Sequence, residues 1–184
     1  MVYHLQSTDD ELRAGCIQQH RLAQQYLYQR YFGQLLGTAW RYTQDREEAV
    51  EVTNAAFLKI FNSLEKYQDT GSFGGWMAKI VIHTAIDHVR HQAVYRRNMN
   101  ATVEADLPVH NDSLSRLETE DLLRLIQQLP PASRSVFSLY VIDGYKHREI
   151  ADLLGIDEGT SKWHLSTARK ELQQLVKKYY QTSL

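Results

Sequence analysis

Apolar residues recur every three or four positions along most of this chain, with polar residues between them. That spacing places the apolar side chains on one face of an α-helix, whereas a half-buried strand would alternate at every second residue. No stretch alternates in this way between turn signals, and proline, which interrupts helices, occurs only after residue 107. The pattern therefore predicts an all-α protein.

The N-terminal part of the pattern opens with a helix-start signal. Thr8 and Glu11 have the spacing of a capping box, in which each side chain accepts a hydrogen bond from the other residue's backbone N–H. Apolar residues continue at helical spacing as far as Trp40. We expect one long helix here, with a break near Gly33.

A second start signal follows at Asp45 and Glu48, which repeat the same spacing. They precede a helix expected over residues 46–64, and after the loop KYQDTGSFGG a further helix is expected over about 76–91. Helical periodicity leaves an acidic face outside on the first of these helices. The residues expected on that face are Glu47, Glu48, Glu51 and Asn54.

Helical periodicity is lost between residues 95 and 112, where the sequence becomes polar and acidic and contains Pro108. A stretch of this composition is typical of a flexible linker. The sequence thus predicts two small helical domains, over residues 1–97 and 115–184, joined by a flexible acidic linker over residues 98–114.

The second domain ends in a pattern typical of a helix-turn-helix. Helices are expected over residues 115–129, 132–142, 147–154 and 158–178, separated by prolines and glycines. The last two meet in a short turn that contains Gly155, and Asp157 is placed to cap the final helix. Such a pair commonly lays its second helix in the major groove of DNA.

Winding the final helix at 3.6 residues per turn separates a core face from a DNA-facing side. The expected core stripe is Ser161, Leu165, Ala168, Leu172 and Leu175. The residues expected to contact duplex DNA are Gly159, Thr160, Lys162, Trp163, His164, Ser166, Thr167 and Lys170. For Trp163 two alternatives are open: the indole packs on thymine methyl groups, or it is partly buried against a neighbouring element.

Composition changes this picture only through the distribution of charge. The net charge is −1, but basic residues gather in 79–97 and in 162–178, one cluster in each domain.

Cys16 is the only cysteine, so neither an internal disulfide nor a cysteine-rich zinc site is expected. Without a signal peptide or a long apolar run, we expect a cytoplasmic protein with no membrane insertion, no cofactor and no metal.

Three segments resemble the sigma-70 family of RNA polymerase specificity subunits, in its extracytoplasmic-function (ECF) type. DREEAVEVTNAAFLKIFNSLEKY and FGGWMAKIVIHTAIDHVR are similar to region 2, and LPPASRSVFSLYVIDGYKHREIADLLGIDEGTSKWHLSTARKEL is similar to region 4. The resemblance implies a non-enzymatic initiation factor that binds core RNA polymerase through its clamp helices and flap. It also implies promoter DNA as a ligand and an anti-sigma factor as an inhibitory partner.

The same resemblance assigns roles to residues of the first domain. Clamp-helix docking would fall to Glu48, Glu51, Asn54 and Lys59. Capture of the minus-ten element would fall to Tyr67, Phe73, Trp76, Lys79, His83, Arg90, Arg96 and Arg97. Base stacking on an aromatic ring contributes about 1–3 kcal/mol, comparable with the cost of unstacking a base, so an opened strand could be held without chemical energy.

Four residues depart from the family pattern. His83 stands where the family usually has Asn, seven residues after the motif's Trp. Ser161 replaces a usual Val on the core stripe, where it is either tolerated near the helix cap or marks shallower packing. Trp163 and His164 replace a small residue and Arg, so we do not transfer the family's minus-thirty-five sequence preference to this chain.

Two other functions fit parts of the sequence. His83, Asp87 and His91 share one helical face and could in principle ligate a metal, although no nucleophile or base accompanies them. A helix-turn-helix regulator that binds DNA alone would explain the second domain. It would not explain the aromatic loop 67–76 or the acidic helix face before it.

Overall fold

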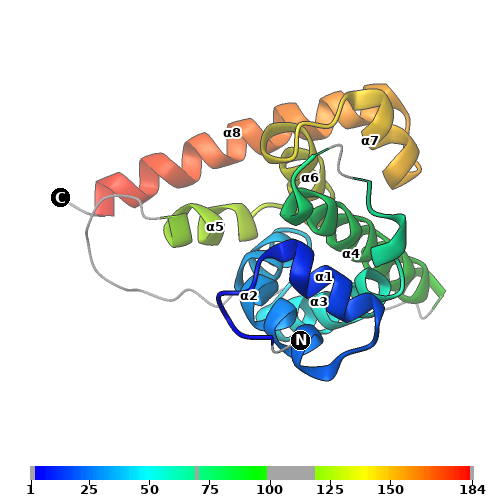
Figure 1. Ribbon diagram of the computed structural model, residues 1–184. Helices are drawn as coiled ribbons and strands as arrows, with labels where there is room; N and C mark the ends of the chain where they lie inside the picture. The colour runs from blue at the N-terminus through cyan, green and yellow to red at the C-terminus, as the bar shows by residue number, and fades with distance from the viewer. Residues whose placement is uncertain (1–2, 69–70, 99–118, 183–184) are drawn as a thin grey trace. The chain divides into compact units, whose positions relative to one another are not determined.

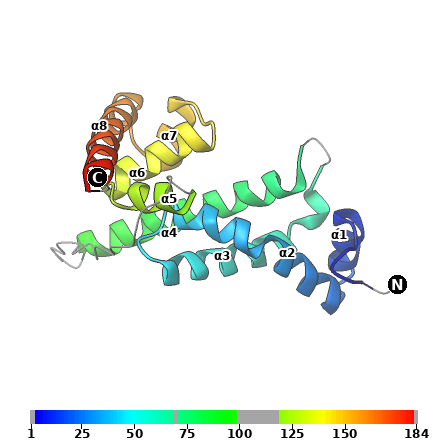
Figure 2. The same cartoon turned by 90° about the vertical axis from the view of Figure 1, so that its left-hand side faces the viewer.

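The computed structural model describes residues 3–68, 71–98 and 119–182, and within these ranges the side chains of 93–98, 119–120 and 180–182 are not described. The chain forms two compact units, Met1–Val89 and Arg90–Leu184. Every regular element among the described residues is a helix (Figures 1 and 2), which confirms the all-α prediction. The linker predicted over 98–114 lies, from residue 99 onwards, outside the described residues.

The first unit is a bundle of α1 (Asp9–Ile17), α2 (Arg21–Trp40), α3 (Arg46–Phe61), the short 3₁₀ turn η1 (Leu64–Lys66) and the start of α4 (Phe73–Asn98). In Figure 1, α1 to α3 are the blue and cyan helices. α2 packs against α3, and α1 packs against both α2 and η1. The core is formed by large apolar side chains that are fully buried, among them Leu12, Leu27, Leu35, Ile60, Met77 and Val81.

The capping box predicted at the first helix is present. The Glu11 N–H donates to Thr8 Oγ1 at 3.2 Å, and the Thr8 N–H donates to Glu11 Oε2 at 2.7 Å. Two backbone donors that the helix itself cannot satisfy are thereby paired.

The predicted helix break near Gly33 was wrong, because the chain turns at Gln18–His20 and Gly33 lies inside α2. Gln19 takes the left-handed conformation (φ 57°) usually reserved for glycine. Its N–H bonds the Cys16 carbonyl at 2.9 Å, and the His20 N–H bonds the Gly15 carbonyl at 2.8 Å. These two bonds form a Schellman motif that ends α1 without a glycine or proline at the turn.

The second unit consists of α5 (Thr119–Gln127), α6 (Pro131–Phe137), a widened π-type turn η2 (Ser138–Ile142), α7 (His147–Leu154) and α8 (Glu158–Thr182). The single helix predicted over 132–142 therefore changes geometry halfway, where the Asp143 N–H reaches back five residues to the Ser138 carbonyl at 3.0 Å. One apolar cluster joins α5 to α8: Leu125, Ile126, Leu129, Ala168 and Leu172, with Phe137, Leu175 and Val176 packed against it.

The predicted helix-turn-helix is formed by α7 and α8. Gly155 ends α7 in the left-handed conformation (φ 66°), and the Ile156 N–H bonds the Ala151 carbonyl at 3.1 Å. Asp157 caps α8 as predicted: Oδ1 accepts from the Thr160 N–H at 2.8 Å, and Oδ2 accepts from the Thr160 hydroxyl at 2.6 Å. These hydrogen bonds hold the pKa of the Asp157 carboxyl below its usual value. No helix among the described residues is long and apolar enough to cross a bilayer.

Gly15→Ala should destabilise the protein by about 1–3 kcal/mol, the usual cost of overpacking. A Cβ at this position would lie 2.5 Å from Tyr3 Cζ and 2.6 Å from Ala23 Cβ, so α1 and α2 could not stay as close as they are. Gly33→Ala is the matched control, because its Cβ meets nothing within 4 Å and removing a helix-interior glycine should stabilise by about 0.5–1 kcal/mol. Urea unfolding measures both; a destabilising Gly33→Ala would contradict a continuous α2.

Candidate nucleic-acid interfaces

An aromatic cluster lies where α4 begins. The Phe73 and Trp76 rings stack at 12° with centroids 5.8 Å apart, and the Tyr67 ring lies 5.1 Å from Phe73 and 5.3 Å from Trp76. Tyr67 and Trp76 are half-buried, whereas Phe73 is only 8% exposed. The expectation that Phe73 offers a stacking surface was therefore wrong, because its ring is covered by its aromatic neighbours and supports Trp76 from within.

Side chains of α1 and α2 hold this cluster in place. Asp9 accepts from Arg30 at 2.7 Å and from the Tyr31 hydroxyl, and the Tyr31 ring meets Phe73 edge-on with centroids 5.9 Å apart. Burial, together with the bond to Asp9, raises the pKa of Tyr31. The Arg13 guanidinium lies 5.1 Å from the centroid of the Tyr67 ring, and the Tyr67 hydroxyl donates to the Gly71 carbonyl at 2.6 Å. The loop before α4 is thus braced from two helices.

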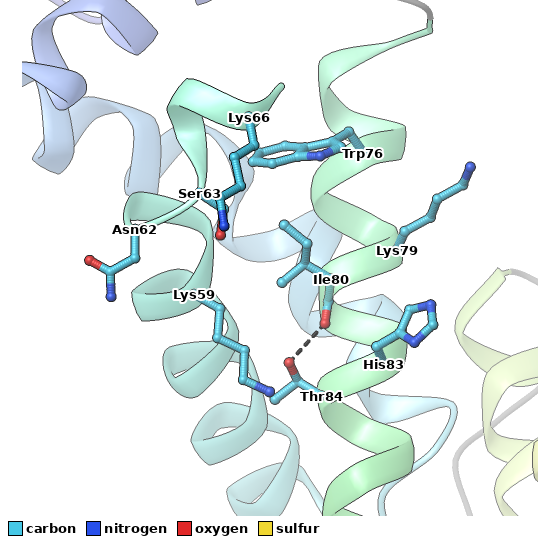
Figure 3. A pocket seen from close by; sticks show the side chains of 9 residues that line it. All are labelled: Lys59, Asn62, Ser63, Lys66, Trp76, Lys79, Ile80, His83 and Thr84. Carbon is cyan, nitrogen blue, oxygen red and sulfur yellow. Dashed lines mark hydrogen bonds between the residues drawn. The ribbon is translucent and has the colours of Figure 1, made fainter. Parts of the chain in front are cut away.

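A pocket of about 660 Å³ opens beside Trp76, between the end of α3 with η1 and the first turns of α4 (Figure 3). Its walls combine an apolar side, formed by Trp76 and Ile80, with polar and cationic groups. The residues that line it are Lys59, Asn62, Ser63, Lys66, Trp76, Lys79, Ile80, His83 and Thr84, and this lining holds three lysines and no carboxylate. A flat, anionic ligand such as a nucleotide suits such a lining, since the ring can stack and the lysines can meet phosphate.

The cationic residues predicted along α4 are only partly described. Lys79, His83 and Arg90 are exposed, and in Figure 3 the side chains of Lys79 and His83 extend outward from the helix. The side chains of Arg96 and Arg97 lie outside the described residues. The alternative metal site of His83, Asp87 and His91 finds no support, because the described part of the chain contains no group of three or more such side chains close enough to share an ion.

The acidic face of α3 differs from the expected one at two positions. Glu48 was predicted to point outward, but its side chain is only 11% exposed. Oε1 accepts from Nε2 of His88 on α4 at 2.8 Å, and Oε2 accepts from the Gln44 N–H at 2.6 Å. The carboxylate turns inward because these two donors satisfy it there. The sequence alone did not indicate this pair.

Leu58 occupies the outer face of α3 instead. Its side chain is 67% exposed, and it follows Glu47, Glu51 and Asn54 at helical spacing, all of which are exposed. The spacing could have identified it, because residues 47, 51, 54 and 58 share one face of a helix. Lys59, also exposed, approaches Asp87 of α4 at 3.9 Å.

The two faces of α8 agree with the periodicity. The core stripe is buried at Ser161, Leu165, Ala168 and Leu172 and half-buried at Leu175. On the opposite side the predicted DNA contacts Gly159, Lys162, Trp163, Ser166 and Lys170 are exposed, and Thr160 and Thr167 are half-buried. Trp163 is 61% exposed, which decides against the alternative that it is buried on a neighbouring element.

Of two histidine–serine hydrogen bonds, one joins the two helices of the helix-turn-helix and the other joins the motif to α6. His147 Nδ1 and Ser161 Oγ lie 2.9 Å apart, and the Tyr140 ring stacks on His147 at 4.5 Å, so Ser161 is fully buried with its hydroxyl paired. His164 Nδ1 lies 3.1 Å from Ser133 Oγ of α6. Burial lowers the pKa of His164, which favours the neutral form of its imidazole. His164 was predicted as a DNA contact, but one of its ring nitrogens already bonds α6.

Both units match models of one protein family. Residues 27–94 match the model described as Sigma-70 region 2, and residues 119–172 match the model described as Sigma-70, region 4. The first match contains the pocket and its aromatic cluster, and the second contains the helix-turn-helix.

Several curated relatives are similar over most of this chain. The ECF RNA polymerase sigma factor SigE of Mycolicibacterium smegmatis is 25% identical over 77% of this chain and 56% of its own length. The RNA polymerase sigma-H factor of Pseudomonas aeruginosa is 25% identical over 79% of this chain and 81% of its own length. The ECF RNA polymerase sigma-E factor of Haemophilus influenzae is 24% identical over 93% of this chain and 96% of its own length.

Among solved structures, the sigma factor RpoE of Bartonella quintana, in complex with the anti-sigma factor NepR, has a similar fold. Its TM-score is 0.56 at 17% identity, over 83% of this chain and 96% of that one. Since both halves carry family regions in the same order and the relatives bear that family's name, this chain belongs to the sigma-70 family of RNA polymerase sigma factors, in its ECF type.

Proposed function

We propose that this protein binds core RNA polymerase and directs promoter-specific transcription initiation. The observation that carries the proposal is the pairing, in one chain, of a lysine-lined pocket beside an aromatic ring with a helix-turn-helix whose outer face is exposed. The first feature suits an unpaired nucleotide and the second suits duplex DNA. Such a factor performs no covalent step of its own, and it would act in the cytoplasm, where polymerase and chromosome are found.

The pocket beside Trp76 is the proposed site of minus-ten capture. A base flipped from the opened duplex would stack on the exposed part of Trp76 or Tyr67, and Lys66 and Lys79 would meet the backbone phosphates. Phe73 supports the Trp76 ring rather than meeting the base. Arg90, Arg96 and Arg97 are proposed to continue the electrostatic path along the strand.

The outer face of α3 is the proposed surface for the polymerase clamp helices. It combines Glu47, Glu51 and Asn54 with the exposed Leu58, an apolar centre with an acidic surround that suits a basic partner helix. Lys59 stays in this proposal at the edge of the face. Glu48 contributes indirectly, since its bond to His88 fastens the start of α3 to α4.

The regulation of the protein is proposed from its relatives. A sigma factor of similar fold was solved in complex with an anti-sigma factor. We infer that an inhibitory protein of that kind binds this chain and covers the surfaces that polymerase would use.

Reconstituted transcription tests this function. Core RNA polymerase with this protein should initiate at specific sites in a promoter library, whereas core alone should not. Tight duplex binding with no initiation would instead indicate a helix-turn-helix regulator.

Trp76→Ala and Lys170→Ala should impair different steps on a promoter found in this way. Trp76→Ala should reduce open-complex formation by about 5- to 150-fold, the equivalent of one stacked base, and Trp76→Tyr should restore most of it. Lys170→Ala should weaken duplex binding and reduce its salt-dependence slope by about 1. Permanganate footprinting follows strand opening, and filter binding follows the duplex. Equal effects of both variants on both steps would contradict this division.

Leu58→Ala should weaken binding to core polymerase by more than tenfold, if Leu58 is the centre of the docking face, since buried anchors typically contribute more than 1.4 kcal/mol. Leu5→Ala is the matched control, because Leu5 is comparably exposed but lies outside α3. Fluorescence anisotropy of labelled protein measures both affinities. Equal affinities of the two variants would rule out the proposed face.

A further inference from the structure

Trp163 is a large apolar side chain in an unusual place. It is 61% exposed, whereas Trp40 and Trp76 are half-buried. It is the sixth residue of α8, on the second turn of the helix that follows the helix-turn-helix turn. Side chains at this end of such a helix are the ones that reach base edges in the major groove.

The indole is held in position rather than left loose on the surface. The His164 ring meets it edge-on, with centroids 4.8 Å apart and planes at 68°. His164 is in turn bonded through Nδ1 to Ser133 Oγ at 3.1 Å, and Ser133 is a buried residue of α6. A ring braced in this way loses little conformational freedom on binding, which favours affinity.

The charges around Trp163 favour DNA as the partner. Lys162, Arg169 and Lys170 are exposed on the same helix, and Lys177 and Lys178 follow. Of the two acids at the helix start, Asp157 bonds Thr160 and Glu158 lies 3.7 Å from Lys162. A cationic surface with one apolar ring complements a polyanion that carries an apolar group, and in the major groove that group is the C5 methyl of thymine.

We propose that Trp163 is a specificity-determining residue that packs on a thymine C5 methyl in the minus-thirty-five element, with His164 and Ser133 as its positioning residues. This inference rests on the proposed function, because it takes α8 to lie in the major groove. It assigns the protein a preference for thymine at one position of the minus-thirty-five element.

The test uses duplexes selected from a random library by the full-length protein bound to core polymerase. Each thymine of the selected element is replaced in turn by deoxyuridine, which removes only the methyl group. One replacement should weaken binding about fourfold, the effect of losing one buried methyl. Trp163→Ala should bind the thymine and deoxyuridine duplexes equally. Gln173→Ala, a change at an exposed residue of α8 outside the predicted DNA contacts, should keep the wild-type ratio.

The positioning residues are tested on the same thymine-to-deoxyuridine affinity ratio, which a general loss of stability would not change selectively. His164→Ala and Ser133→Ala should lower the ratio towards one. His164→Phe should lower it as well, since phenylalanine supplies a ring edge to the indole but cannot bond the Ser133 hydroxyl. A ratio unaffected by His164→Ala would remove His164 and Ser133 from the proposal.

Three outcomes would overturn the role of Trp163: no selected duplex, no thymine sensitive to deoxyuridine, or a Trp163→Ala variant with the wild-type ratio. Weaker core polymerase binding by Trp163→Ala, with that ratio unchanged, would assign the residue to a protein partner. The proposed function is judged separately by initiation. A Trp163-dependent ratio without any specific initiation would support this inference while the proposed function failed.

Discussion

The rotation of α4 about its own axis is the constraint on which the proposed minus-ten site depends. Met77, Val81 and Ala85 form a row at intervals of four residues and are fully buried. Once that row is in the core, the neighbouring row of Trp76, Ile80 and Thr84 lines the pocket. The next row, Lys79 and His83, also lines it, with exposed side chains. Hydrophobic burial thus sets the orientation of the side chains proposed to meet DNA.

Polar pairs between helices fix the relative positions of neighbouring helices more narrowly than apolar packing does. Apolar contacts tolerate small rotations and shifts, whereas a buried hydrogen bond has a narrow geometry and leaves a costly unpaired group when broken, about 1–3 kcal/mol. Glu48 with His88 joins α3 to α4, His147 with Ser161 joins α7 to α8, and Ser133 with His164 joins α6 to α8. Each of these pairs lies next to a surface to which we assign a role.

The aromatic residues show how support and contact are divided among similar side chains. Phe73 is buried between Tyr31, Tyr67 and Trp76, so it gives the cluster its rigidity, while Trp76 remains partly accessible at the pocket. In the second unit His164, which is bonded to Ser133, supports the ring of the exposed Trp163 in the same way. A rigid ring needs little ordering when a base binds, which is an advantage for a protein that must hold an opened strand without chemical energy.

The sequence by itself determined the helical fold, the helix-turn-helix with its Asp157 cap, and the division of α8 into a core stripe and an exposed face. These features follow from local periodicity and capping, which depend on residues three or four positions apart. The tertiary structure alone decided that Glu48 turns inward, that Phe73 is buried and that Leu58 is exposed. It also placed the first break between helices at Gln19 rather than at Gly33. At Gln19 the chain turns sharply, and Gly15 nearby is in close contact with Tyr3 and Ala23. The Glu48–His88 bond joins residues forty positions apart, and such a contact leaves no pattern in either segment.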